Sequence, residues 1–222
     1  EGGPFRYWRF NMDSVSADVH WKGPSLSINN FQGQFYHGQI HGVLDADFTA
    51  QTGTDMSYRV GITNTDMRTL MQDISRATNR LEGTLSGELN LTHLNSADWK
   101  SWQGDGRMHL KQGLIWDIPM FGMFSTVLNS IVPGVGNSRA EEANATFIIT
   151  NSIISTKDLA IRASAMRLYY TGTVDFDANV NARMEASLFR DWWLPGKVFS
   201  LALTPLTKLL EYKVTGTLGN PK

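Results

Sequence analysis

The sequence predicts a mainly β protein with a few helices, in which a long, curved antiparallel sheet forms a hydrophobic groove that about three short helices pack against or cap. The first observation behind this prediction is a run of strict alternation, with apolar residues at every even position from Val174 to Leu188 and polar residues at the odd positions. Successive side chains of a strand point to opposite faces, so the run indicates one β-strand with an apolar and a polar face. At about 3.3 Å per residue this strand would reach roughly 50 Å, whereas strands usually have about 5–6 residues.

Further alternating runs are the second observation. They predict strands at residues 15–21, 40–48, 81–91, 108–118, 146–149 and 212–218. Glycines recur at similar places in these runs, as at Gly42 and Gly87, and indicate bends or the close approach of another backbone. The aromatic-rich start of the chain, from Phe5 to Phe10, is interpreted as an edge strand that packs into the sheet.

The third observation is a change from the period of two to the helical period, which predicts the short helices. The first helix is indicated by apolar residues at i, i+3, i+4 and i+7 spacing, namely Met67, Leu70, Met71, Ile74 and Ala77. Either Thr65 or Asn64 is expected to cap this helix, and Asn79 is expected to follow its end.

The other two predicted helices cover residues 118–132 and 198–210, and Pro205 interrupts the second of these. The helix at 118–132 carries no charge, so it must be buried in protein or lie against lipid. Packing on the sheet is one interpretation, and plugging the groove, capping its end or touching a membrane are the alternatives. A polar linker at 134–144 is predicted to lead from this helix to the next strand.

Composition excludes several classes of function. Lys and Arg number 20 against 21 Asp and Glu, for a formal net charge of -1, so there is no basic excess for nucleic acid binding. The chain has no cysteine, which excludes disulfides, thiol catalysis and cysteine-based metal sites. No apolar stretch approaches the length of about 18 residues that a membrane-spanning helix needs.

The 222 residues suffice for one large all-β domain, and we expect a single domain over 1–222 with a soft subdivision near residue 80. The chain begins at Glu1 with neither an initiator methionine nor a signal peptide. It is therefore interpreted as a processed chain or as a piece of a longer one.

Residues for catalysis or metal binding do not form a recognisable pattern, so we expect no enzyme activity, cofactor or metal. The pairs Asp45/Asp47 and Asp175/Asp177 lie on the polar sides of predicted strands, where solvated charge is expected. A glycosidase would need two carboxylates that face each other about 5–9 Å apart. His37 and His41 would lie about 13 Å apart along a strand, too far for one metal ion unless the chain bends at Gly38.

The order and spacing of several short motifs resemble the C-terminal region of AsmA-like proteins, which are related to TamB-type proteins. These motifs are Asp98-Trp99, Gly106-Arg107-Met108, Gly113-Leu114-Ile115-Trp116-Asp117-Ile118-Pro119, Lys157-Asp158-Leu159, Gly172-Thr173-Val174-Asp175-Phe176-Asp177 and the segment from Tyr212 to Pro221. The resemblance covers about Leu81 to Pro221, and it extends more loosely to residues 1–80 through Phe35-Tyr36-His37-Gly38.

The resemblance implies a non-enzymatic envelope protein of Gram-negative bacteria, anchored in the inner membrane by one N-terminal helix and extending into the periplasm. It further implies that the concave face of a long β-sheet carries phospholipid between membranes or supports outer-membrane assembly. This chain would be a soluble periplasmic part whose anchor is absent. Its implied partners are phospholipid or another acyl-chain lipid, and inner- or outer-membrane proteins.

The candidate lipid-binding residues are the apolar positions of the alternating runs: Leu85, Leu89, Leu110, Leu114, Trp116, Val174, Phe176, Val180, Met184 and Leu188. The candidates on the uncharged helix, which would cap the groove or touch a membrane, are Met120, Phe121, Phe124 and Leu128. Two alternatives remain open: a structural or protein-interaction module of the periplasm with a closed core, and an enzyme that acts on glycans or lipids.

Overall fold

The computed structural model describes residues 2–7, 9–74, 81–113, 140–163, 166–188 and 209–222, without the side chains of Tyr7, Leu188, Leu209 and Leu210. In chain order its elements are β1 (Phe5–Tyr7), β2 (Phe10–Met12), β3 (Ser14–Lys22), β4 (Ser25–Phe35), β5 (Gly38–Asp47), β6 (Asp55–Asp66), α1 (Met67–Ile74), β7 (Thr84–Asn95), β8 (Asp98–Gly113), β9 (Ala140–Thr150), β10 (Ile153–Ala163), β11 (Met166–Asp175), β12 (Asn179–Leu188), β13 (Leu209–Thr217) and β14 (Asn220–Pro221).

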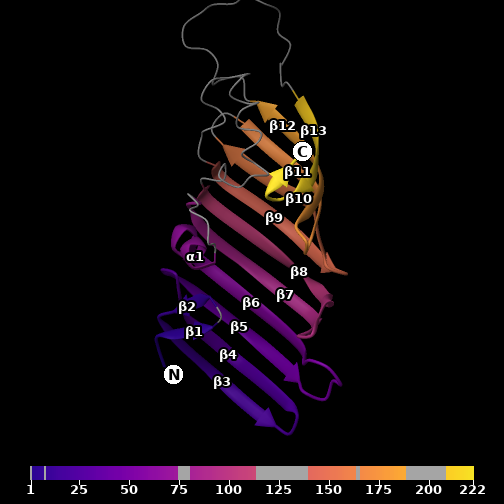
Figure 1. Cartoon of the computed structure of the whole chain (residues 1–222). Helices are drawn as coiled ribbons and strands as arrows, with labels where there is room; N and C mark the ends of the chain where they lie inside the picture. Colours follow the sequence, from indigo (N-terminus) through magenta and orange to yellow (C-terminus); the bar gives the residue numbers. More distant parts are fainter. Residues whose placement is uncertain (1, 8, 75–80, 114–139, 164–165, 189–208) are drawn as a thin grey trace, which may run out of the picture.

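One antiparallel sheet of 12 strands contains every strand except β1 and β2 (Figure 1). Each strand pairs with its neighbours in the chain, from β3 at one edge to β14 at the other, so the sheet is a continuous meander. This confirms the predicted fold class, a mainly β protein built on one long antiparallel sheet. The strands β6 and β7, on either side of residue 80, pair with each other in this sheet.

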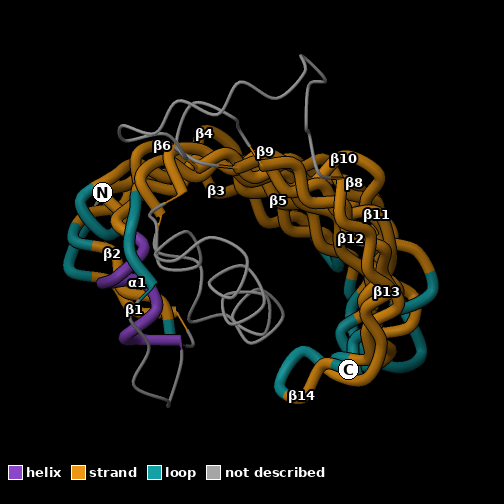
Figure 2. The backbone as a smooth tube through the Cα atoms, turned by 90° about the horizontal axis from the view of Figure 1, so that it is seen from above, coloured by secondary structure: helices purple, strands orange, loops and turns teal. Residues whose placement is uncertain are grey.

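The sheet is curved, and Figure 2 shows its strands as an arch that is open on one side. The helix α1 lies on the inner side of this arch (Figure 2). There α1 and β2 pack against Ile40, Ile62 and Leu85 of the sheet. These three side chains therefore belong to the concave face, and the register of the ladder assigns the other residues to one face or the other.

The register brings apolar residues of successive strands together on the concave face. One row of directly paired positions runs from β7 to β12 through Leu85, Leu110, Ala143, Ile161, Leu168 and Ala186. A second row runs from β4 to β12 through Ile28, Leu44, Tyr58, Leu91, Gly104, Ile149, Ile154, Val174 and Val180. A one-residue slip would reverse the faces of a strand, so this apolar continuity fixes the register.

β-Bulges keep apolar residues on the concave face where the alternation in the sequence changes phase. In β4 the pairing to β5 shifts between Ile28 and Phe31, so that Leu26 and Ile28 share a face with Phe31 and Phe35. The extra residue is accommodated at Asn30, which has a φ of 50°. Asparagine adopts this left-handed conformation more readily than most residues do.

The prediction of one long strand from Val174 to Leu188 is wrong, because the segment forms a β-hairpin. β11 ends at Asp175 and β12 begins at Asn179. The Asp175 carboxylate closes the turn by accepting hydrogen bonds from the backbone and side-chain N–H groups of Asn179, each at 2.8 Å. Val174 pairs directly with Val180, so even-numbered residues face the same side before and after the turn and the alternation does not reveal it.

The turns that join β3–β4, β5–β6, β7–β8, β9–β10, β11–β12 and β13–β14 lie along one side of the meander, which we call the turn rim. Neighbouring turns of this rim are bonded through their backbones. Phe48 N–H donates to the Pro24 carbonyl at 2.9 Å, and Ser96 N–H donates to that of Thr54 at 3.0 Å. The connection that contains α1 lies at the opposite rim, because it joins β6 to β7.

The helix predicted from residue 67 is confirmed as α1, and Ala77 and Asn79 lie outside the described residues. Its cap is Asp66 and not Thr65 or Asn64, because the Asp66 carboxylate accepts hydrogen bonds from the backbone N–H of Thr69, at 2.8 Å, and from its hydroxyl. Partial burial acts to raise the pKa of Asp66, but these hydrogen bonds outweigh it and hold the pKa below its ordinary value.

Three other local predictions are corrected by the structure. The segment predicted as an edge strand forms the separate β1–β2 hairpin, from which Phe10 packs near Phe35. Residues 140–144 of the predicted linker belong to β9, and the last two residues of the helix predicted at 198–210 belong to β13. The helix predicted at 118–132 and the rest of the one at 198–210 lie outside the described residues.

Candidate functional site

The concave face contains six of the candidate lipid-binding residues: Leu85 and Leu89 on β7, Leu110 on β8, Val174 on β11, and Val180 and Met184 on β12. Leu188 ends β12, but its side chain is not described. The candidates Leu114 and Trp116, with Met120, Phe121, Phe124 and Leu128 of the predicted helix, lie outside the described residues. The last lipid-binding candidate, Phe176, lies in the β11–β12 turn. The parity of each run thus assigned these six residues to a common face of the sheet.

The concave face has two halves that differ in solvent exposure. We call the concave side chains of β9 to β13 the C-terminal half and those of β3 to β8 the N-terminal half. In the C-terminal half, Leu168, Met184 and Val214 are all 0 % exposed. They form one cluster with Val180, and Leu110 of β8 joins it. These residues therefore form a hydrophobic core among the described residues.

Part of the N-terminal half is accessible to solvent, although Leu91 and Leu94 of β7 are buried. Leu44 of β5, Val60 of β6 and Leu89 of β7 are half-buried, and all three lie on the concave face. Val60 was not among the candidates, although Met56, Tyr58, Val60 and Ile62 alternate in the sequence as clearly as the runs that were used. This signal would have found the concave residues of β6.

Phe176 lies in the β11–β12 turn at the turn rim, and it packs in one cluster with Leu91 and Ile149 of the concave face. Its ring is 5.8 Å from that of Trp99 and 5.7 Å from that of Trp102, both on β8. The contact spans two intervening strands, β9 and β10. Trp99 is 48 % exposed, so this aromatic cluster forms part of the surface of the rim.

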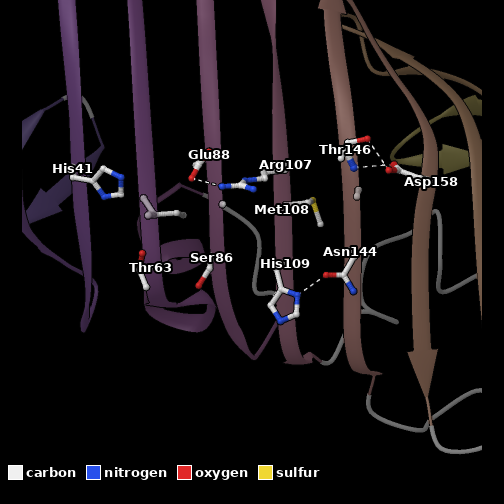
Figure 3. Close-up of a pocket in the computed structure, with 13 residues that line it drawn as sticks. His41, Thr63, Ser86, Glu88, Arg107, Met108, His109, Asn144, Thr146 and Asp158 are labelled. Carbon is white, nitrogen blue, oxygen red and sulfur yellow. Dashed lines mark hydrogen bonds and ion pairs between the residues drawn. The ribbon is translucent and has the colours of Figure 1, made fainter.

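The polar, convex face contains a hollow of about 440 Å³ that crosses β5 to β10 (Figure 3). Its walls include Glu88, Arg107, His109, Asn144 and Asp158. Arg107 donates a hydrogen bond to Glu88 at 2.6 Å, and this bond holds the pKa of the Glu88 carboxyl below its ordinary value. His109 Nδ1 and the side-chain oxygen of Asn144 are joined by a further hydrogen bond.

Other groups of this hollow are also engaged with their neighbours. The Asp158 carboxylate accepts hydrogen bonds from the backbone N–H of Thr146 at 2.8 Å and from its hydroxyl at 2.7 Å. Partial burial acts to raise the pKa of Asp158, but these hydrogen bonds lower it overall. Hydrogen bonds from neighbouring strands favour the charged form of both carboxylates, so these residues form a cross-strand polar network.

A second hollow of about 550 Å³ adjoins the first and shares His41 and Glu88 with it. The His41 ring lies over Gly61 of β6, where an added Cβ atom would come within 2.5 Å of the ring. Glycine at this position thus allows the imidazole to lie flat against the sheet. The convex surface is therefore shaped by side chains that lie along it.

Metal-binding clusters are not found in the part of the chain that the structure describes, where no three His, Asp or Glu side chains come together to hold an ion. His37 lies in the turn before β5, whereas His41 lies within that strand. Over the same described ranges, the structure contains no helix with the length and apolar character needed to cross a bilayer.

Comparisons with known proteins add no relatives. The chain matches no protein-family model, no curated protein and no solved structure.

Proposed function

We propose that this chain is a non-enzymatic lipid-binding segment of a Gram-negative envelope protein, which holds phospholipid acyl chains along its concave face. In this proposal it supports phospholipid transport between the inner and outer membranes and outer-membrane assembly. The observation that carries the proposal is the apolar lining of the concave face, which continues in register from β4 to β12, while the convex face is mostly polar apart from exposed residues such as Val43 and Ile148.

The dimensions of this face suit acyl chains. Neighbouring strands lie about 4.8 Å apart, so a sheet of 12 strands is roughly 50 Å long across its strands. One leaflet of a bilayer has a hydrocarbon thickness of about 15 Å, half of the usual core. The sheet is therefore long enough for several acyl chains to lie one after another along it.

The energetics favour the same occupant. Each methylene group moved from water to an apolar surface contributes about 0.8 kcal/mol, so a dozen give strong binding. The arch is open on one side (Figure 2), and a lipid bound there can keep its head group in water. Burial of a charged or zwitterionic head group among Leu, Val and Ile side chains would be costly.

The half-buried residues of the N-terminal half are the proposed contact surface. Leu44, Val60 and Leu89 lie on three neighbouring strands and remain partly accessible. In the C-terminal half most apolar side chains are buried and only some, such as Val174, are half-buried, so we expect lipid contacts there to be fewer. The periplasmic location and the membrane anchor of the whole protein belong to the proposal through the resemblance to AsmA-like proteins.

A matched pair of variants tests this proposal. Val60 faces the concave side of β6, whereas Val43 on the adjacent strand β5 faces the convex side and is 42 % exposed. Purified chain is titrated with a phospholipid that carries a fluorescent acyl chain, and lipid extracted from detergent-free preparations is measured by mass spectrometry. We expect V60D to weaken lipid binding at least tenfold and V43D to leave it unchanged.

The alternative is a structural or protein-interaction module of the periplasm, and the fully buried side chains of Leu168, Met184 and Val214 in the C-terminal half favour it. This alternative would be supported if detergent-free preparations of the chain contained no extractable lipid and the chain did not bind the fluorescent phospholipid. Equal weakening by V60D and V43D would show that the concave face has no special role in lipid binding.

A further inference from the structure

The outer edge of β3 is a strand edge that the described part of the chain leaves mostly unpaired (Figure 1). Its inner edge is bonded to β4 from Ser14 to Lys22. On its outer edge, Val15 exchanges two backbone hydrogen bonds with Gly2, at 2.8 and 3.0 Å. Val15 thus directs its N–H and C=O groups outward, and Gly2 occupies the start of the ladder.

Alternation of the backbone groups identifies the rest of this ladder. Ser16 pairs with Gln32 of β4, and the next pair joins Asp18 to Asn29. Between these two pairs β3 advances by two residues and β4 by three, so the extra residue of the bulge is in β4. β3 is therefore regular, and its odd-numbered residues Ala17, Val19 and Trp21 direct N–H and C=O groups outward. Even-numbered residues such as His20 bond to β4.

The concave side chains of β3 resemble those of an interior strand more than those of a protected edge strand. Val19 and Trp21 pair with Ile28 and Leu26, so they extend the apolar concave rows to the edge of the sheet. They are 60 % and 69 % exposed. Natural edges are commonly protected by proline, bulges, short strands or charged side chains; β3 has nine residues with no proline and no bulge of its own, and its charged residues Asp18 and Lys22 lie on the convex face.

We propose that this edge joins two copies of the chain, whose β3 strands pair antiparallel about a two-fold axis at Val19. This register brings all three outward-directed residues into bonded pairs, Val19 with Val19 and Ala17 with Trp21 of the second copy. It places Asp18, whose exposed carboxylate accepts one hydrogen bond from the Asn30 side chain at 2.6 Å, directly opposite His20 of the second copy on the convex face. The concave apolar rows of the two sheets become continuous.

Analytical ultracentrifugation of the full chain tests the proposal, with proline as the probe. In V19P the lost N–H is directed outward, so the β3–β4 ladder is retained while the dimer ladder is interrupted. The control is K213P on β13 at the other edge, where Thr215 exchanges bonds with Lys222 and the alternate residue Lys213 is also directed outward. We expect a dimer whose dissociation constant V19P raises at least tenfold and K213P leaves unchanged.

Backbone hydrogen exchange gives a second readout that does not depend on a variant. The Val19 and Trp21 amides should exchange slowly in concentrated samples and quickly in dilute ones, whereas the His20 amide should be protected in both. A chain that stays monomeric at high concentration would overturn the proposal, as would a dimer that K213P dissociates and V19P does not. Protection of Val19 that is independent of concentration would show that the same chain covers the edge and would also overturn it.

Discussion

The two halves of the concave face are built by one register and one kind of alternation, yet they differ in exposure. Leu168 and Met184 in the C-terminal half are removed from solvent, whereas Val60 and Leu89 in the N-terminal half remain partly accessible. The same apolar pattern thus contains mostly buried residues in the C-terminal half and mostly half-buried residues in the N-terminal half, where Leu91 and Leu94 are the buried exceptions on β7. Alternation specifies which side of a strand is apolar, and it does not specify what contacts that side.

The largest expected effect lies in the C-terminal half. Met184 is 0 % exposed and belongs to the cluster that includes Leu168 and Val214. We expect M184A to lower the free energy of unfolding by about 2–5 kcal/mol, because it leaves a cavity among fixed neighbours. Urea denaturation measures this change. L89A in the half-buried region is the comparison, and an equal loss there would remove the distinction between the halves.

A smaller effect is expected where the two halves meet, between β8 and β9. Gly106 lies beneath the ring of Phe147, and an added Cβ atom would overlap that ring and come 2.7 Å from the backbone carbonyl oxygen of Glu88. We expect G106V to lower the free energy of unfolding by about 1–3 kcal/mol through overpacking. Thermal unfolding followed by circular dichroism measures it. Unchanged stability would show that Phe147 moves aside at little cost.

The smallest effect concerns the cap of α1, which packs on the N-terminal half. We expect D66A to lower the free energy of unfolding by about 0.5–2 kcal/mol at pH 7, because Thr69 loses its acceptor. The pKa of Asp66 is lower in the folded chain than in the unfolded one, so its contribution is complete above the unfolded pKa of about 3.9. This contribution is lost as the pH falls through the folded pKa.

The difference between wild type and D66A should therefore shrink as the pH falls below about 4, toward the folded pKa of Asp66. Urea denaturation at several pH values measures this difference, and exchange of the Thr69 amide reports on the cap itself. A difference that is constant down to the folded pKa would mean that the charge of Asp66 does not contribute to the cap.

Much of the sheet was predictable from alternation, since the runs that include Leu44, Leu89 and Val214 all became strands of one sheet. The hairpin at residues 174–188 was not, because pairing of Val174 with Val180 preserves the phase through the turn. The bulge in β4 had the opposite effect, since it changes the phase within one strand and hides the strand from a search for strict alternation.

The candidate site was predictable to a similar extent. Residue parity placed Leu85, Leu110 and Met184 on a common face, because each strand of a meander repeats the same two-sided pattern. Parity did not separate Met184, which is buried, from Leu89, which is half-buried. That difference depends on which groups pack over each half of the face. The alternation of apolar and polar residues along a strand does not encode those groups.

The meander also bears on how such a protein can change in size. Since each strand bonds to its neighbours in the chain, a β-hairpin is a self-contained unit of growth. Duplication or deletion of one hairpin would lengthen or shorten the sheet by a fixed step and leave the remaining ladders as they are. The length of the sheet can thus change in steps of one hairpin while its two faces keep their character.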